Sequence, residues 1–369
     1  MLENRNERWI RYKKELSTMC TNKKIPFNAC FEFTPLCNFN CNMCYVHLTT
    51  EQAAKQGKML STEQWLEMGR QAQKMGTLFL ELTGGEALTR KDFPLLYSAL
   101  VDMGFLITLR SNGYMLTDEI LALLTKKKPR HISITIYGAS DETYQKVCGV
   151  KDGFTVVSKN VEKLIAAGID VRLTITKTKN NEDDVVKIKE WAKKIGKNVE
   201  VFGGIFQPRE GTERKVNDVR LTFSDEDCEI TDDMKFRKYP ESTDISRTEL
   251  FSGCKNFGAK YCITWNGHLT VCNGFTYIWE NPFVDNLESA YKRLYERLYK
   301  LKKPKECADC KYFDFCIACP VNFVSETGDP QKTCENICRI ARYYYKKALL
   351  ITDDKESSEK ELPMKMECD

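Results

Sequence analysis

Six short apolar runs, rich in β-branched and aromatic residues, recur between residues 28 and 206 of the 369-residue chain. Each run is followed by a segment in which apolar residues return at helical spacing. Strands that alternate with helices favour a parallel sheet covered by helices. Because a closed barrel of this kind needs eight strands, six units predict an α/β fold with a partial (β/α)6 TIM-like barrel. The six runs are residues 29–34, 77–83, 105–110, 131–137, 170–176 and 198–206.

Local signals mark where several of these helices begin and end. Ser61 and Gln64 form a capping-box pattern ahead of a predicted helix over residues 64–74. Asp92 and Pro94 mark the start of the helical pattern over residues 95–103. The predicted N-caps of the next three helices are Thr117, Ser140 and Asn181, and the predicted stop residues are Gly76, Gly104 and Gly168.

Changes in composition divide the rest of the chain. The net charge is +4 with both signs interleaved, which gives no reason to expect nucleic acid or a membrane as a partner. The sequence has no run of about 18 apolar residues and no secretory signal, so a cytoplasmic protein is expected. The predicted parts are an N-terminal helical segment (1–25), the barrel (26–210), a polar linker (211–250), a cysteine-rich module (251–345) and a charged, flexible tail (346–369).

The 17 cysteines are the unusual feature of the composition. The cytoplasm keeps thiols reduced, so metal binding explains them better than disulfides do. Cys37, Cys41 and Cys44 follow the first predicted strand, at the sheet edge where ligands bind in such folds. Three thiolates from one loop can hold a [4Fe–4S] cluster and leave one iron open to a small molecule. Structural zinc is the alternative, and it needs a fourth ligand such as Cys30 or His47.

This CxxxCxxC spacing resembles the signature of the radical S-adenosylmethionine (radical SAM) enzymes. The stretch Leu82-Thr83-Gly84-Gly85-Glu86, at the end of the second strand, resembles the Gly-Gly-Glu motif of that family. The resemblance implies that Gly84, Gly85 and Glu86 bind the amino group of SAM.

The resemblance extends to the ends of the third and fourth strands. There it implies roles in the SAM pocket for Ser111, Asn112 and Thr135. The family often has an arginine where this chain has Cys148. A thiol cannot grip a carboxylate as an arginine does, so the partner of the SAM carboxylate must come from elsewhere in the chain.

The cysteines of the second module are similar in spacing to the SPASM extension, a small iron–sulfur domain, expected here as α+β, that carries two auxiliary [4Fe–4S] clusters. The spacing between Cys316 and Cys319 is one residue shorter than the family pattern. A pair of zinc ribbons is the alternative, and Cys334 stays open as a replacement for Cys338. The resemblance implies that one cluster is held by Cys254, Cys262, Cys272 and Cys319, and the other by Cys307, Cys310, Cys316 and Cys338.

Proteins that resemble this chain mostly modify peptides or protein side chains. The resemblance therefore implies a maturase that cleaves SAM to a 5′-deoxyadenosyl radical and abstracts hydrogen from a ribosomally made peptide. The expected products are a thioether, a carbon–carbon crosslink or a related modification. The expected partners are the peptide substrate and a reductant such as a ferredoxin or flavodoxin. A separate leader-binding protein is also considered, because the segment before the first strand is too short for the peptide-binding domain of some members.

Two other hypotheses stay open. An anaerobic sulfatase maturase would place an Asp directly after the cysteine of the Gly-x4-Cys block, where this chain has Asn273. An amide cannot accept the proton, so the sequence favours this hypothesis less. A non-catalytic iron–sulfur or zinc scaffold is the hypothesis outside the enzymes. The sequence assigns no catalytic acid or base, and it leaves the substrate, the bond formed and the oligomeric state undetermined.

Overall fold

The computed structural model describes residues 5–221, 245–316 and 318–356. Its centre is an eight-stranded sheet in the order β6-β5-β4-β3-β2-β1-β7-β8. Adjacent strands from β1 to β6 are all parallel, which confirms the predicted repeat of strand–helix units. These strands are β1 (Asn28–Glu32), β2 (Phe79–Thr83), β3 (Leu106–Ser111), β4 (His131–Thr135), β5 (Val171–Thr176) and β6 (Val199–Phe202).

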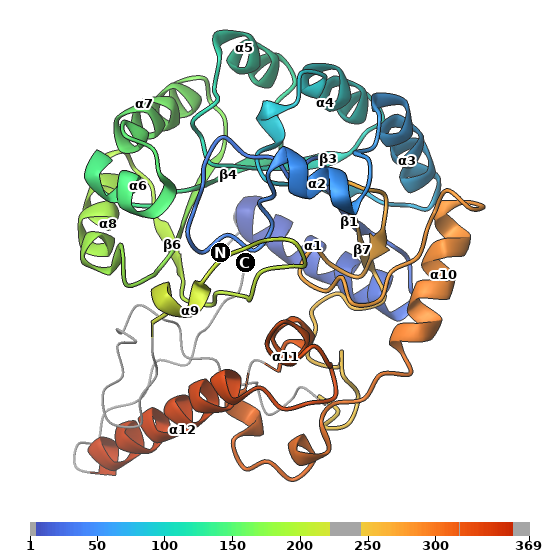
Figure 1. Cartoon of the computed structure of the whole chain (residues 1–369), viewed down its shortest axis with the longest axis vertical. Helices are drawn as coiled ribbons and strands as arrows, with labels where there is room; N and C mark the ends of the chain where they lie inside the picture. The colour runs from blue at the N-terminus through green and yellow to red at the C-terminus, as the bar shows by residue number, and fades with distance from the viewer. Residues whose placement is uncertain (1–4, 222–244, 317, 357–369) are drawn as a thin grey trace.

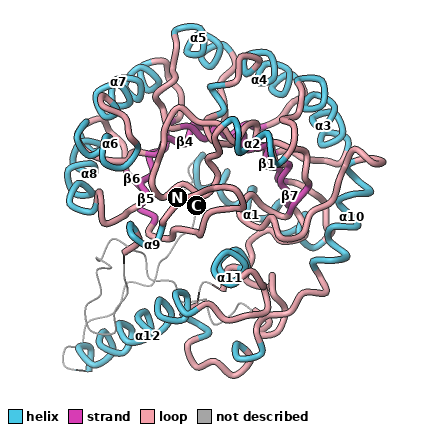
Figure 2. The backbone as a smooth tube through the Cα atoms, in the orientation of Figure 1, coloured by secondary structure: helices cyan, strands magenta, loops and turns pink. Residues whose placement is uncertain are grey.

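The helices α3 to α8 cover the outer face of this curved sheet (Figure 1). Phe31 on β1 packs against Trp65 on α3, with ring centres 5.1 Å apart. Residues that alternate with such buried positions, among them Cys30 and Glu32, face the opposite, inner side. The strands trace an open arc in Figure 2. The helices are α3 (Thr62–Lys74), α4 (Phe93–Asp102), α5 (Asp118–Lys126), α6 (Asp141–Cys148), α7 (Gly153–Ala166) and α8 (Val185–Lys194).

Most of the predicted caps are confirmed. Ser61 and Gln64 form the reciprocal capping box of α3, and Thr117 and Ser140 cap α5 and α6. Asn181 lies at the N-cap position of the 3-10 turn η2 (Glu182–Asp184), which runs directly into α8, but its side chain makes no capping bond. Its side-chain amide bonds instead to the backbone oxygens of Tyr137 and Thr176, which fixes the loop after β5.

The cysteine-rich module shares the sheet of the barrel, which the sequence did not predict. β7 (Lys260–Ile263) pairs in parallel with β1, and β8 (Leu269–Thr270) pairs antiparallel with β7. The module therefore continues the barrel sheet beside the strand that leads into Cys37. This pairing fixes the position of the module's first cysteines relative to the first cysteine loop.

The predicted linker and tail also differ from the structure where it describes them. Residues 216–219 form α9 (Val216–Val219), and Val216 and Val219 are buried. The tail boundary at residue 345 falls inside α12 (Glu335–Glu356). Residues 222–244 of the predicted linker and residues 357–369 of the predicted tail lie outside the described residues.

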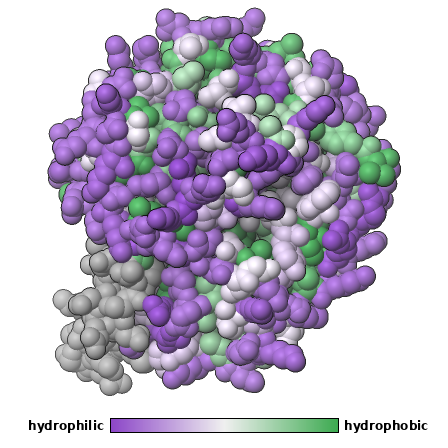
Figure 3. Space-filling model, in the orientation of Figure 1, coloured by the Kyte–Doolittle hydropathy of each residue, from purple (hydrophilic) through white to green (hydrophobic). Residues whose placement is uncertain are grey.

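The remaining elements complete the chain. None of the helices within the described ranges is long and apolar enough to cross a membrane. The face shown in Figure 3 is largely hydrophilic, with only small apolar patches. The elements are α1 (Arg5–Asn22), α2 (Thr50–Gln56), α10 (Leu287–Leu298), α11 (Pro320–Thr327) and the short 3-10 turns η1 (Ala87–Thr89), η2 (Glu182–Asp184), η3 (Lys305–Cys307) and η4 (Phe313–Phe315).

Candidate functional site

The loop that carries Cys37, Cys41 and Cys44 leaves the carboxyl end of β1 and is anchored to α6. The backbone nitrogens of Asn40 and Asn42 donate to the backbone oxygens of Cys148 and Val147, at 2.9 and 3.0 Å. These bonds tie the middle of the loop to the last turn of α6, whose carbonyls have no partners within the helix. The three thiols are thus presented at the edge of the sheet where the sequence predicted a site.

Cys41 is buried, Cys37 and Cys44 are partly buried, and backbone donors reach two of the three sulfurs. The backbone nitrogens of Phe39 and His47 donate to the sulfurs of Cys37 and Cys44, each at 3.3 Å. Burial raises the pKa of both thiols. The pKa of Cys41 is lowered, mainly by a hydrogen bond from the Cys148 thiol. Amide donors aimed at sulfur and exclusion of solvent are features that tune iron–sulfur ligation.

The Gly-Gly-Glu loop after β2 packs directly on the start of the cysteine loop. The backbone nitrogens of Gly85 and Glu86 donate to the oxygens of Thr34 and Leu36, at 2.6 and 2.9 Å. A Cβ on Gly84 would overlap the backbone of Thr34, and one on Gly85 would overlap that of Leu36. The close contact between this loop and the backbone before Cys37 therefore requires glycine at both positions.

Glu86 is brought together with Ser111 and Asn112, as the sequence predicted, but its carboxylate is already occupied. One oxygen accepts from the Ser111 hydroxyl at 3.0 Å and the Asn112 backbone nitrogen at 2.7 Å, and the other accepts from Leu88. Burial raises its pKa. Asn112 Nδ2 lies 3.7 Å from the Cys37 sulfur. Glu86 therefore links the ends of β2 and β3 to the cysteine loop.

Thr135 stands apart from this network. Its hydroxyl lies 3.4 Å from that of Thr174 on the neighbouring strand. Within the described part of the chain, no contact joins Thr135 to Glu86, Ser111 or the cysteine loop. No contact with the other predicted SAM-site residues in the described part of the chain therefore supports a role for Thr135 in binding SAM.

Arg214, which sequence reasoning missed, reaches the cysteine loop from the segment predicted as a linker. Its Nη2 contacts Asn40 Oδ1 and lies 2.8 Å from His47 Nδ1. Its charge contributes to lowering the pKa of Cys41. No local pattern could have revealed this contact, because it joins residues far apart in the sequence.

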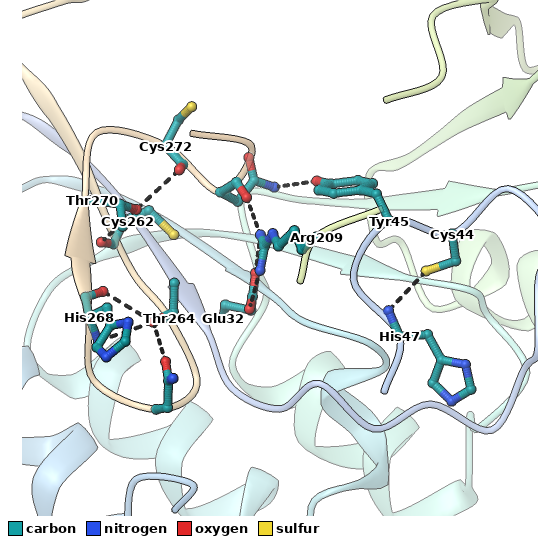
Figure 4. Close-up of polar contacts among 12 residues, drawn as sticks. Glu32, Cys44, Tyr45, His47, Arg209, Cys262, Thr264, His268, Thr270 and Cys272 are labelled. Atoms are coloured by element: carbon teal, nitrogen blue, oxygen red, sulfur yellow. Dashed lines mark hydrogen bonds and ion pairs between the residues drawn. The ribbon is translucent and has the colours of Figure 1, made fainter. Parts of the chain in front are cut away.

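Arg209 was also missed, and it joins the two cysteine-bearing regions (Figure 4). Its Nη1 and Nη2 donate to the two carboxylate oxygens of Glu32 at 2.8 Å each, and Nη2 also donates to the backbone oxygen of Asn273. Its guanidinium lies 5.3 Å from the ring centre of Tyr45, and Asn273 Nδ2 donates to the Tyr45 hydroxyl at 3.0 Å. Tyr45 follows Cys44 and Asn273 follows Cys272, so this network fixes the two cysteine sites relative to one another.

Three of the four cysteines predicted for the first auxiliary cluster face a common lysine. Lys260 Nζ lies 3.0 Å from the Cys254 sulfur. Burial acts to lower the pKa of Lys260, but the neighbouring Cys254, Cys272 and Cys319 outweigh it and raise that pKa. Cys262 differs. Its thiol lies against that of Cys30, its register partner across β1 and β7. No contact among the described residues joins Cys262 to the other three, because the β7–β1 pairing turns it toward β1.

The second predicted set is brought together. Burial, followed by the neighbouring Cys338 and Cys310, raises the pKa of Cys307 to about 11. Burial and the same neighbours also raise the pKa of Cys316. Cys334 is buried beside Arg220 and Glu326 instead. These surroundings support Cys338 over Cys334 as the ligand.

Within the described ranges, no three His, Cys, Asp or Glu side chains stand at the separation of a single bound metal ion. All cysteines described by the structure are free of disulfides.

The chain was compared with protein families and with curated proteins. Residues 31–192 match the radical SAM superfamily. An AdoMet-dependent heme synthase of Methanosarcina barkeri is 26% identical over 81% of this chain and 92% of its own length. A probable GTP 3′,8-cyclase of Saccharolobus islandicus is 29% identical over 45% of this chain. The sporulation killing factor maturation protein SkfB of Bacillus subtilis is 30% identical over 47% of this chain. The matches to the cyclase and SkfB span only 52% and 41% of those proteins.

Solved structures extend the likeness to the whole fold. Streptococcus suis SuiB is 17% identical and superposes with a TM-score of 0.63 over 92% of this chain and 84% of SuiB. SuiB bound to its precursor peptide SuiA gives a TM-score of 0.62 at 18% identity, over 92% of this chain and 82% of SuiB. The native anSMEcpe with bound AdoMet gives 0.59 at 13% identity, over 91% of this chain and all of anSMEcpe. At these identities the structures establish a shared fold, which includes the cysteine-rich region.

Proposed function

Because residues 31–192 make this chain an enzyme of the radical SAM superfamily, we propose that it modifies a ribosomally synthesised peptide. The reaction is hydrogen abstraction from an unactivated carbon, followed by formation of a thioether, a carbon–carbon crosslink or a related bond. The observation that carries the proposal is the likeness to SuiB over 92% of this chain, together with the assembled cysteines of the second module. A structure of SuiB bound to its precursor peptide SuiA has been solved.

The residues of the first site fit a [4Fe–4S] cluster with SAM. Cys37, Cys41 and Cys44 would hold the cluster, and the Gly84–Glu86 loop, Ser111 and Asn112 would form the pocket beside it. When bound, this pair supplies a 5′-deoxyadenosyl radical. The protein's own residues hold the cysteine loop in place, shield its sulfurs in part from solvent and supply amide donors to Cys37 and Cys44.

The proposed crosslink removes two hydrogens from the peptide. One leaves with the deoxyadenosyl group, and the other leaves as a proton together with one electron, which requires an acceptor. We assign this task to the second module, where Cys254, Cys272 and Cys319 lie beside Lys260, and Cys307, Cys310, Cys316 and Cys338 form a second set. A ferredoxin or flavodoxin in the cytoplasm would supply the electron for SAM cleavage.

Two other activities are weighed against this proposal. The heme synthase of M. barkeri matches this chain over 92% of its own length, which makes a non-peptide substrate the second candidate. An anaerobic sulfatase maturase is the third, and the amide of Asn273, bonded to Tyr45, leaves it without the base it would need at that position.

Peptide modification is tested by coexpression with short peptides encoded beside the gene, followed by mass spectrometry. A peptide substrate predicts loss of two hydrogens from one peptide, and transfer of deuterium from a labelled peptide into 5′-deoxyadenosine. Formation of 5′-deoxyadenosine without any change in these peptides, combined with turnover of an iron-free or iron-containing tetrapyrrole, would favour the heme-synthase type of activity.

Iron content tests the auxiliary clusters. Three clusters of four irons predict about twelve irons in each reconstituted chain. Cys338→Ala is expected to lower that number by about four, since its thiol belongs to one cluster. Cys334→Ala is the matched control on the same helix, and it is expected to keep the full iron content. A loss of iron in the Cys334 variant but not in the Cys338 variant would reverse the assignment.

A further inference from the structure

We propose that Arg214 binds the carboxylate of the methionine part of SAM. This inference rests on the proposed function, because it requires SAM to bind beside Cys37, Cys41 and Cys44. It assigns a ligand-binding role to a residue outside the matched family region, which ends at residue 192.

The guanidinium of Arg214 is held beside the cysteine loop through its Nη2 atom. Nη2 contacts Asn40 Oδ1 and His47 Nδ1, one on each side of Cys41 and Cys44 in the loop. The Nε atom is buried and has no hydrogen-bond partner. The Nε atoms of Arg209 and Arg220 are unpaired as well. Arg214 differs from them at its terminal nitrogens, because Nη2 contacts an amide and an imidazole and no carboxylate of the described residues.

Arg214 also lacks an acidic partner within the described ranges of the chain. Arg209, five residues earlier, shows the contrasting case, because both of its terminal nitrogens bond to Glu32. A partly buried cation without a carboxylate is costly unless an anion is bound.

The two sides of the cysteine loop differ in charge. Glu86 lies on the Cys37 side, linked through Asn112, whose amide is 3.7 Å from the Cys37 sulfur. Arg214 lies on the opposite side, against Asn40 and His47. The methionine end of SAM carries an ammonium and a carboxylate. A site with an acidic side and a basic side suits that pair, and guanidinium is the group that best matches the planar carboxylate.

A ligand lacking only the carboxylate provides the test. The binding of SAM and of decarboxylated SAM is measured by equilibrium dialysis on reconstituted, oxidised protein, so that no turnover occurs. Arg214→Met is expected to weaken SAM binding by about 10- to 100-fold, the range for a hydrogen bond to a charged group, and to leave the binding of decarboxylated SAM unchanged. Arg214→Lys should lie in between, because an ammonium keeps the charge but lacks the planar fork.

The neighbouring exposed Lys215 provides the matched control, and Lys215→Met is expected to bind both ligands as the original protein does. Equal weakening of both ligands in Arg214→Met would overturn the proposal, since Arg214 would then act on the loop or the cluster alone. If Arg214→Met loses iron, the comparison is made in Arg214→Lys, where a selective loss for SAM supports the proposal and an equal loss overturns it. Failure of the unchanged protein to bind SAM at all would instead reject the proposed function.

Discussion

Gly85→Ala is expected to lower the formation of 5′-deoxyadenosine at least about 100-fold, the loss that misplacement of a reacting centre by about 1 Å can produce. The added Cβ would overlap the backbone carbonyl of Leu36 and approach that of Pro35. Neither atom belongs to a flexible side chain that could swing aside. The segment just before Cys37 must therefore move, and the cysteine loop must move with it.

Gly204→Ala is the matched control for this substitution. No heavy atom lies within 4 Å of a Cβ built at Gly204, so this variant is expected to match the original protein. Anaerobic assays of 5′-deoxyadenosine and of bound iron compare the two variants. A Gly85 variant with full iron content and at least half of the original rate would show that the close packing of the two loops is unnecessary.

The sequence was informative wherever local physics decides the structure. The six strands and the capping box of Ser61 and Gln64 depend on side-chain periodicity and on hydrogen bonds between neighbours. Asn181 makes no capping bond because its Oδ1 accepts from the backbone nitrogen of Thr178 instead. Short-range signals therefore predicted the barrel well, but not each loop.

The joining of the two modules could not be predicted locally. β7 pairs with β1 across more than two hundred residues of sequence, and a four-residue strand carries little signal of its own. That pairing also determines where Cys262 points. The resemblance counted Cys262 among the ligands of the first auxiliary cluster, whereas the sheet places it against Cys30.

The sequence predicted which residues form the candidate site better than it predicted their contacts. Glu86, Ser111 and Asn112 do lie together, and the carboxylate of Glu86 already accepts three hydrogen bonds from protein donors. Arg209 and Arg214 come from a polar stretch that looked like a linker. Their importance depends on contacts with Glu32, Asn40 and His47, which only the folded chain reveals.

The largest effect is expected when Cys37, Cys41 and Cys44 are all replaced by alanine. The three sulfurs are the thiol groups that the loop presents at the carboxyl end of β1, and hydrogen bonds from Phe39 and His47 already reach two of them. Without them the loop offers no ligand for iron, so SAM has no open iron to bind. The second module shares no ligand with this loop, so the variant is expected to keep about eight of its irons.

The most direct measurement is therefore the yield of 5′-deoxyadenosine from SAM, by the reduced and reconstituted protein, with and without these three cysteines. Our account predicts clear formation by the original chain and none above background by the triple-alanine variant. Comparable yields from both proteins, or no product from the original chain with its full iron content, would contradict it.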